Sequence, residues 1–572
     1  MVSPAAVTES DLSCPLQARC PGCPLGDRPY AQGLAQKGGG LAAALGPYRE
    51  LGPELQPARA ATGTQAYRLR AKLVSRGRAL GLFERGSHRV VDVTGCRVLS
   101  AELTRASVAL RRLLPLPIYG ADLRQTSEGV LVTLLTEDPN ARAVLEAAAA
   151  GLVERGDALS VALGVRRAGD VRLLVSEPEL LLGPSEARHA LSSTAPYGYA
   201  AHGGFVQAHP GQASYVYAEI ARGLGARLTM EQPRVLELFA GNGSLALSLA
   251  RAGARVTAVE AYAPAIRLAE RAAREQQLEV RAVAADATRF AQQLARDSFD
   301  AIVVNPPRRG LDVDLRRALG RAAPRALAYV SCSPHSLARD AWHLATLGLS
   351  LHSAEPLDMI PWSDAIEVLA WFQPTLPLAP RVLLEEEECV AIDKAPHDQP
   401  AESLARVRGR PGWERAVPLD GWEAGVSGVC WFAKQAGAGF VADERELTAL
   451  ARGNLRKQGT IARPGAGGGA RYKKQAEAGR HSLVGVRSRE TVARGIVNDF
   501  GRIRHPVLGE ASRGDAASNE FLQHRHGLDR AFLHVAWSRL RLPSGKIVEA
   551  RAELAPDLQR CLDSLTSDQP AL

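Results

Sequence analysis

Between residues 232 and 372 the chain repeats one pattern: a short apolar run, a turn and then a helix-like segment. The apolar runs are, in order, "RVLELF", "RVTAVE", "VRAVAA", "FDAIVV", "ALAYVS" and "AIEVLAWF". Strands that alternate with helices in this way pack as a mostly parallel sheet with helices on both faces. This region therefore predicts a doubly wound α/β domain, and such domains bind their ligands at the carboxyl edge of the sheet.

At 572 residues the chain exceeds the size of a single core. Changes in composition divide it into four expected parts: a Gly-, Pro- and Ala-rich segment 1–50, a β-rich, antiparallel central domain 51–225, the α/β domain 226–375 and a second α+β domain 382–572. The Pro-rich stretch "QPTLPLAPR", 373–381, is typical of a linker. The stretch "RPGAGGGARYKK", 463–474, predicts a flexible basic loop.

The formal net charge of +9 favours a polyanionic partner such as RNA. The amino terminus lacks the basic start and apolar core of a signal peptide, and no apolar stretch reaches the roughly 20 residues that span a bilayer. The eight cysteines are too few and too scattered for a secreted disulfide scaffold. These features predict reduced thiols, a cytoplasmic location and no membrane partner.

The turn after the first strand, "FAGNG", carries two glycines, Gly241 and Gly243. Glycine allows the backbone to approach a ligand closely. Glu260 ends the next strand, where its carboxylate could accept both hydroxyls of a ribose. With Ala246 the turn also satisfies the G-x-G-x-x-G/A pattern of dinucleotide-binding proteins, so these residues alone leave a nicotinamide or flavin cofactor open.

The fourth strand ends in "NPPRRGLD", which places Asn305 and two prolines at the carboxyl edge. The prolines rigidify the loop that presents the amide. Asn/Asp-Pro-Pro at this position is typical of S-adenosylmethionine-dependent methyltransferases.

The fifth strand delivers a lone thiol, Cys332, to the same edge, and Glu367 enters the last strand. A lone cysteine is ordinarily a small buried apolar side chain. A thiolate that adds to carbon 6 of uracil, however, makes carbon 5 nucleophilic, and a carboxylate must later remove the carbon-5 proton. Next to the Asn-Pro-Pro loop we expect Cys332 to be this nucleophile, with a lowered thiol pKa, and Glu367 to be the base.

Residues 14–372 resemble the iron–sulfur RNA (uracil-5-)-methyltransferase family. The matching segments occur in the family's order: "YRLRAKL", "GSHRVVDVTGC", "HGGFVQAHPGQASYVYAEI", "LFAGNGS", Glu260, "NPPRRGLD", "VSCSPHSLARD" and "DMIPWSDAIEVL". The resemblance is closest to the branch that acts on 23S rRNA, and tRNA is the other candidate substrate.

The resemblance implies a class I S-adenosylmethionine-dependent methyltransferase fold, an RNA-facing central domain, and Cys332 and Glu367 as catalytic residues. It implies that the cofactor contacts are Gln207, Phe239, Gly241, Gly243, Ser244, Glu260, Asp286 and Asn305. The chain departs from the family at three places. Ser333 replaces an asparagine after Cys332, "DAIE" replaces a His- or aromatic-containing run, and His209 replaces an asparagine.

Cys14, Cys20, Cys23 and the distant Cys96 supply four thiolates. Four thiolates suit either a [4Fe–4S] cluster or a tetrahedral zinc ion. Zinc ribbons favour two short C-x2-C pairs, and this chain has one. The family resemblance implies the [4Fe–4S] cluster.

The segments between 382 and 556 resemble, more weakly, the large-subunit rRNA pseudouridine synthases. Alignment at "VSG" places Glu423 at the family's aspartate, with Asp420 three residues too early, and Gly459 at its tyrosine. These replacements predict a domain without isomerase activity. Residues 452–504 contain thirteen Lys or Arg against three Asp or Glu, which predicts a retained phosphate-binding role.

The sequence therefore predicts an enzyme that methylates uridine at carbon 5 in RNA. Three alternatives remain open: a bifunctional methyltransferase and pseudouridine synthase, an amino-group methyltransferase acting through Asn305, and a non-catalytic RNA-binding or ribosome-assembly protein. Amino-group methylation usually requires an aromatic residue after Asn-Pro-Pro, where this chain has Arg308.

Overall fold

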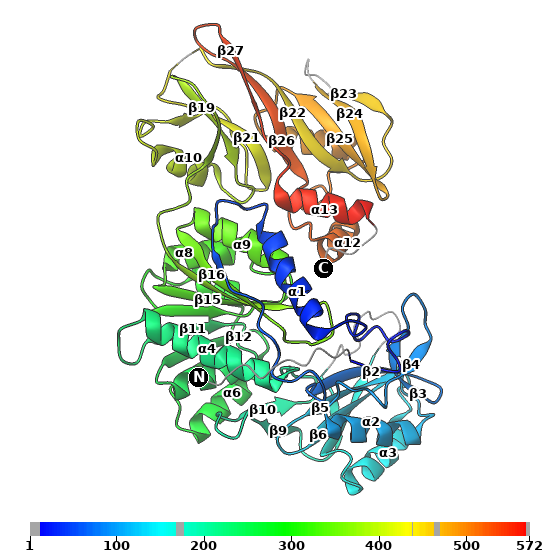
Figure 1. The fold of residues 1–572 in the computed structure, drawn as a ribbon. Helices are drawn as coiled ribbons and strands as arrows, with labels where there is room; N and C mark the ends of the chain where they lie inside the picture. The colour runs from blue at the N-terminus through cyan, green and yellow to red at the C-terminus, as the bar shows by residue number, and fades with distance from the viewer. Residues whose placement is uncertain (1–11, 167–176, 438, 463–468, 568–572) are drawn as a thin grey trace. The chain divides into compact units, whose positions relative to one another are not determined.

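The computed structural model describes residues 12–166, 177–437, 439–462 and 469–567 (Figure 1). The chain forms two compact units. The first contains Met1–Leu337 with Leu351–Pro374, and the second contains Ala338–Ser350 with Thr375–Leu572. The boundary after Pro374 falls within the stretch 373–381 that the sequence marks as a linker.

The first unit contains the doubly wound sheet that the sequence predicts. Its eight strands lie in the order β1-β16-β17-β15-β14-β11-β12-β13. They span β1 Glu54–Leu55, β11 Arg234–Leu238, β12 Arg255–Glu260, β13 Val280–Ala284, β14 Ala301–Val304, β15 Ala326–Ser331, β16 Leu349–Leu357 and β17 Glu367–Pro374. Strands β13, β12, β11, β14 and β15 are parallel, whereas β17 runs antiparallel to β15.

Helices connect these strands because parallel neighbours require a crossover. They are α4 Pro210–Arg227, α5 Ser244–Arg251, α6 Ala263–Glu275, α7 Ala287–Gln292, α8 Val313–Ala322 and α9 Pro334–Thr346. All four residues of β14 and all six of β15 are buried, as expected for central strands covered on both faces. The sequence analysis did not identify β16, whose apolar residues are interrupted by polar ones.

The remainder of the first unit consists of the amino-terminal segment and a second sheet. Helix α1 spans Tyr30–Leu45, and β1 extends the main sheet by pairing with β16. The second sheet comprises β4 Val90–Asp92, β3 Ala79–Phe83, β2 Arg70–Arg76, β5 Gly120–Gln125, β6 Val130–Thr136, β7 Ser160–Val165 and β8 Glu179–Leu182, in this spatial order. Two further strands, β9 Glu186–His189 and β10 Gly198–Ala201, form a hairpin.

The expectation of a purely antiparallel central domain was wrong in one respect. Strands β6 and β7 are parallel, and α3, Arg142–Glu154, connects them. Helix α2, Ala101–Leu113, packs against the same sheet.

The second unit is built on a ten-stranded sheet. The strands are β18 Arg381–Glu385, β19 Cys389–Lys394, β20 Val417–Pro418, β21 Val426–Ala433, β22 Val441–Ala451, β23 Gln458–Ala462, β24 Gly469–Ala478, β25 His481–Ser488, β26 Leu533–Arg541 and β27 Ile547–Arg551. The helices are α10 Pro400–Arg408, α11 Ala493–Arg502, α12 Ala516–His526 and α13 Pro556–Thr566.

Part of the basic loop predicted at 463–474 is a strand. Residues 463–468 lie outside the described residues, whereas 469–474 belong to β24, which pairs with β23 and β25. In the described part of the chain, no helix combines the length and the apolar character needed to cross a membrane.

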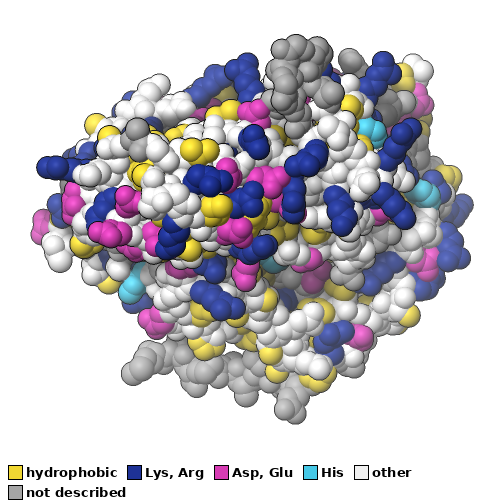
Figure 2. Space-filling view, turned by 90° about the horizontal axis from the view of Figure 1, so that it is seen from above, with side chains coloured by type: hydrophobic (Ala, Val, Ile, Leu, Met, Phe, Trp, Pro, Cys, Tyr) yellow, Lys and Arg dark blue, Asp and Glu magenta, His cyan; other side chains and the backbone are white. Residues whose placement is uncertain are grey.

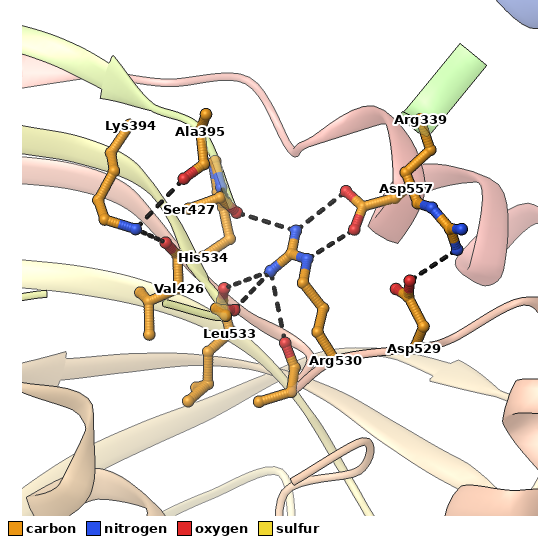
Figure 3. A network of polar contacts seen from close by, with 12 residues as sticks. Arg339, Lys394, Ala395, Val426, Ser427, Asp529, Arg530, Leu533, His534 and Asp557 are labelled. Carbon is orange, nitrogen blue, oxygen red and sulfur yellow. Dashed lines mark hydrogen bonds and ion pairs between the residues drawn. The ribbon is translucent and has the colours of Figure 1, made fainter. Parts of the chain in front are cut away.

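A buried polar network fixes the interior of the second unit (Figure 3). Arg530 donates two hydrogen bonds to Asp557, at 2.6 and 2.9 Å, and a third to Ser427 Oγ at 3.1 Å. Ser427 Oγ is also 3.0 Å from His534 Nδ1. The Lys394 ammonium donates to the backbone carbonyls of Ala395, Glu423 and Val426. These polar groups satisfy one another and have little exposure, so they stabilise the fold.

Candidate functional site

The turn between β11 and α5 adopts left-handed backbone conformations at three of its five residues. The φ angles are +63° at Phe239, +56° at Gly241 and +75° at Gly243. A Cβ atom on Gly243 would lie 2.4 Å from the Cβ of Ala269, so packing alone requires glycine there. A Cβ on Gly241 would meet no atom within 4 Å, so the space beside its backbone is open to a ligand.

Glu260, at the end of β12, is held beside this turn by two backbone amides. Gly241 N donates to its Oε2 at 3.0 Å and Tyr262 N to its Oε1 at 2.9 Å. The sequence analysis missed Asn242, which organises the other side of the turn. Asn242 donates to the carbonyl of Tyr199 and accepts a hydrogen bond from Ser244 Oγ at 2.9 Å.

Asn305 follows β14, which lies next to β11, whereas Asp286 follows β13, the last strand of the sheet order. Asn305 N donates to the carbonyl of Leu238 at 3.4 Å, which ties the end of β14 to the turn after β11. Asp286 follows β13 and caps α7, because its Oδ1 accepts from Arg289 N at 3.0 Å. Strand order places the turn, Glu260 and Asn305 at one edge of the sheet.

Gln207 lies in the loop before α4 and hydrogen-bonds to Tyr217. Tyr217 in turn neighbours Glu237, a buried acid within β11 that the sequence analysis overlooked. Burial raises the pKa of Glu237 to about 8, although the backbone amide of Ala246 lowers it. The signal was present in the sequence: an acidic residue inside an apolar parallel strand requires an explanation.

Cys332 and Glu367 occupy adjacent positions at the carboxyl edge. Ser331, the last residue of β15, pairs with Val368 of β17. Cys332 comes directly after Ser331, and Glu367 comes directly before Val368. The register therefore places the thiol and the carboxyl group next to each other. The structure thus brings the two residues together, and their roles as nucleophile and base stay predictions.

The expectation of a lowered thiol pKa was wrong. Burial and the neighbouring Glu367 carboxylate raise the pKa of Cys332 to about 11. Burial also raises the pKa of Glu367 to about 7. Arg308, from the Asn-Pro-Pro loop, lowers the pKa of both groups. The sequence analysis treated Arg308 only as a missing aromatic residue, whereas the structure gives it an electrostatic role.

Two of the three departures from the family pattern preserve the local structure. Ser333 caps α9, because its Oγ accepts from Ser336 N at 3.3 Å. His209 caps α4 through Nδ1, which accepts from Gln212 N at 3.3 Å, and its Nε2 is 2.9 Å from the Gly63 carbonyl oxygen. Nothing in the structure explains the "DAIE" run.

The structure brings Cys14, Cys20, Cys23 and Cys96 together, and none forms a disulfide. Burial and, to a smaller extent, the other three thiols raise the pKa of Cys23 to about 12. The backbone amide of Gly22 donates a hydrogen bond to Cys20. Clustered thiols with an amide directed at a sulfur fit a thiolate-bound cluster or ion.

In the second unit, the carboxylates named by the sequence analysis have structural partners. Asp420 is buried, accepts from Trp431 N at 2.9 Å and pairs with Arg445. Glu423 Oε2 accepts from Ala493 N, at the start of α11, at 3.0 Å. Gly459 lies on β23, which four intervening strands separate from β21, and the ring of Tyr472 covers it. The strand order does not place Gly459 and Glu423 on neighbouring strands.

The ligand atoms of His343, Asp398 and Glu402 also lie within 4.8 Å of one another. Arg406 already pairs with Asp398, and Glu402 accepts from Gln399 N in the capping box of α10. The Arg406 guanidinium already neutralises the Asp398 carboxylate and would repel a metal cation bound there.

Comparison with known proteins supports the methyltransferase assignment. Residues 215–329 match the family model of the methyltransferase small domain. An uncharacterized RNA methyltransferase of Geobacter sulfurreducens is 27% identical over 456 residues, which cover 72% of this chain and 83% of the relative. The 23S rRNA (uracil(747)-C(5))-methyltransferase RlmC of Shewanella halifaxensis is 39% identical over 169 residues, which cover 29% of this chain and 43% of the relative.

Among solved structures, the fold is similar to that of the Pyrococcus abyssi tRNA (uracil-54, C5)-methyltransferase in complex with S-adenosyl-L-homocysteine. The TM-score is 0.50 at 22% identity, and the match covers 63% of this chain and 87% of that one. The first unit therefore has the class I fold of S-adenosylmethionine-dependent methyltransferases, and the chain is related to RNA methyltransferases.

Proposed function

We propose that this protein transfers a methyl group from S-adenosylmethionine to carbon 5 of a uridine in RNA. The adjacency of Cys332 and Glu367 across β15 and β17 carries the proposal. A lone cysteine beside a carboxyl group has no use in amino-group methylation, whereas methylation of uracil at carbon 5 needs both. The names of two matched proteins, which act on uracil in rRNA and in tRNA, support the same reaction.

The cofactor, when bound, supplies the methyl group, and the turn 239–244, Glu260 and Asn305 would hold it. Cys332 must lose its proton before it attacks carbon 6, and Arg308 is the cation that favours the thiolate. The new carbon–sulfur bond pushes electrons toward carbon 5, which takes the methyl group. Glu367 then removes the carbon-5 proton, the ring double bond re-forms, the carbon–sulfur bond breaks and the thiolate leaves.

RNA that contains 5-fluorouridine tests the reaction, because fluorine at carbon 5 cannot be removed as a proton and the adduct is trapped. We expect a denaturation-stable adduct that requires S-adenosylmethionine. Cys332→Ala should form no adduct, whereas Cys561→Ala, a matched change in the second unit, should form it normally. Adduct formation by Cys332→Ala would exclude this nucleophile.

We further infer that the substrate is ribosomal RNA, most closely 23S rRNA. The match to RlmC, an enzyme named for 23S rRNA, is 39% identical over 169 residues and supports this class. The tRNA enzyme matches at 22% identity. Mass mapping of rRNA and tRNA from a deletion strain tests the assignment. A missing methyl group on a 23S rRNA uridine supports it, and one missing only from tRNA contradicts it.

We propose that Cys14, Cys20, Cys23 and Cys96 hold a [4Fe–4S] cluster, which orders an amino-terminal segment with little core of its own. Protein purified without oxygen should be brown, with a broad band near roughly 400 nm from charge transfer between thiolate and iron. Stoichiometric zinc without iron would instead identify a structural zinc site.

We propose that the second unit resembles a pseudouridine synthase without isomerase activity and binds RNA. Two features support the absence of isomerase activity: Asp420 is committed to Arg445 and Glu423 to the start of α11. Figure 2 shows Lys and Arg side chains spread over one face of the molecule, interleaved with Asp and Glu. Pseudouridine formation lost in Glu423→Ala would show a bifunctional enzyme, and loss only in Asp420→Ala would move the site by three residues.

A further inference from the structure

The segment 358–366 joins β16 to β17 and leads directly into Glu367. Its centre is held in a conformation that large side chains rarely adopt: the φ angle of Trp362 is +68°. Such a residue keeps a left-handed backbone only where its surroundings impose it. The contacts around this segment therefore decide where Glu367 lies.

Asp358, at the start of the segment, is clamped by helix α1. The Lys37 ammonium is 2.6 Å from Asp358 Oδ1, and Tyr30 Oη donates to Oδ2 at 2.7 Å. Lys37 donates a further hydrogen bond, at 3.0 Å, to the carbonyl of Ile360. The side chains of Lys37 and Asp358 are only 3% and 1% exposed, so water cannot replace either partner.

Trp362 contacts the amino-terminal segment that carries the cysteines. Leu25 N, two residues beyond Cys23, donates to the carbonyl of Trp362 at 2.9 Å. The ring of Trp362 meets that of Tyr30 edge-on, with centroids 5.3 Å apart. Its indole nitrogen donates to the carbonyl of Thr64 at 2.8 Å. The same apolar cluster contains Cys14, Cys23 and Cys96.

We propose that Tyr30, Lys37 and Trp362 are positioning residues for Glu367, and that through them the cysteine-bearing segment controls the last step of the reaction. The inference rests on the proposed function. It assigns the amino-terminal segment a role beyond ordering itself, because its helix and its cysteine loop both hold the strained segment before Glu367.

We call the contacts of Tyr30, Lys37 and Trp362 with the segment 358–366 the clamp. Its loss should slow only the removal of the carbon-5 proton. Attack by Cys332 and methyl transfer require β15 and the cofactor turn. The side-chain hydrogen bonds of Tyr30, Lys37 and Trp362 to described residues go to neither element. Removal of the carbon-5 proton requires Glu367 in place, and until that proton leaves, the carbon–sulfur bond cannot break. A released segment therefore stalls the enzyme as a methylated, covalent RNA adduct.

The test uses the full chain and ordinary uridine RNA. In Lys37→Met we expect steady-state turnover to fall about tenfold while the first methyl transfer stays within about twofold, with the covalent adduct accumulating on a denaturing gel. Tyr30→Phe, which removes one hydroxyl group and no charge, should show the same pattern at about threefold. Gln32→Met, at an exposed position of α1, is the matched control and should turn over normally.

Hydrogen exchange supplies a readout that does not depend on activity. The amides of 360–366 should exchange about tenfold faster in Lys37→Met, and also in wild-type protein stripped of its metal, with β11 unchanged. Parallel loss of the first and later turnovers, or unchanged exchange, would overturn the positioning role. If wild-type protein forms no 5-fluorouridine adduct, the proposed function fails; if it forms one and the variants lose both steps together, only the positioning role fails.

Discussion

Glu367 in the first unit and Asp557 in the second both carry carboxyl groups withdrawn from solvent, but their surroundings differ. Burial raises the pKa of Glu367 to about 7, and Arg308 opposes this only in part. Burial acts on Asp557 as well, yet the two hydrogen bonds from Arg530 hold its pKa below the usual value (Figure 3). Glu367 is poised to exchange a proton near neutral pH, whereas Asp557 stays ionised and stabilises the fold.

The same contrast holds for the nucleophile and for the other acids of the second unit. Cys332 stands at an open strand end beside Arg308 and Glu367. Asp420 and Glu423 are committed to Arg445 and to the start of α11. Chemistry is expected where polar groups are left incompletely satisfied, and structural roles where they are fully paired.

The largest expected effect is the loss of methyl transfer when Cys332 of the first unit is replaced; Glu423 of the second unit provides the comparison. Cys332→Ala should lower methyl transfer by at least about 10⁴-fold, because no other group can add to carbon 6. Glu423→Gln should leave methyl transfer within about twofold, since its carboxylate only caps α11. Methyl incorporation from labelled cofactor measures both rates. Comparable losses in the two variants would remove the distinction between the units.

Neutralising a carboxylate should have opposite effects on the stability of the two units. Asp420→Asn leaves Arg445 buried without its counter-ion and should cost about 3–5 kcal/mol of unfolding free energy. Glu367→Gln should instead stabilise the protein by on the order of 1–2 kcal/mol at pH 8. The pKa of Glu367 is raised in the folded state, so its ionisation destabilises the protein progressively from pH 4.5 to about 7, and the full effect is present above that pH. This gain should vanish below the unfolded pKa near 4.5, and denaturant titrations at pH 4.5 and 8 measure it.

The pH dependence of turnover sharpens the role of Glu367. A base with a pKa of about 7 is mostly protonated at pH 6, so turnover should fall about tenfold between pH 8 and pH 6. Methyl transfer in a single turnover precedes proton removal, so its pH profile should show no break near pH 7. That rate should instead follow the ionisation of Cys332, whose pKa is raised to about 11. A flat profile for steady-state turnover would show that another group removes the proton.

The smallest effect concerns RNA binding by the second unit. Arg456, Lys457 and Lys473 are exposed and form no ion pair with any residue that the structure describes, whereas Arg471 pairs with Glu444 at 3.1 Å. Replacing the first three by alanine should weaken RNA binding about tenfold and reduce the salt slope by about two, as phosphate contacts are lost. Arg471→Ala should have a smaller effect. Equal effects would argue against phosphate contacts by the unpaired residues.

Much of the first unit could be predicted because its signals are local. The strand–turn–helix rhythm predicted the sheet, and the glycines, Asn305, Cys332 and Glu367 all fall at its carboxyl edge. What could not be predicted depends on contacts between distant residues. The raised pKa of Cys332 and the role of Arg308 arise only when three loops meet.

The clamp on the segment before Glu367 shows the same limit. Lys37 and Asp358 are 321 residues apart, and no local pattern distinguishes Lys37 from an exposed lysine on α1. In the second unit, Gly459 was aligned by local spacing, but the strand order puts four strands between its strand, β23, and β21. Local chemistry can be read along the chain, whereas partners across the fold cannot.

The most direct test of the central claim is the intact mass of Glu367→Gln after incubation with ordinary uridine RNA and S-adenosylmethionine. The account predicts a covalent complex whose mass is that of protein, RNA and one added methyl group, because addition and transfer precede proton removal. Cys332→Ala/Glu367→Gln should form none. Free methylated RNA released at the wild-type rate by Glu367→Gln, or a complex that survives in the double variant, would contradict the mechanism.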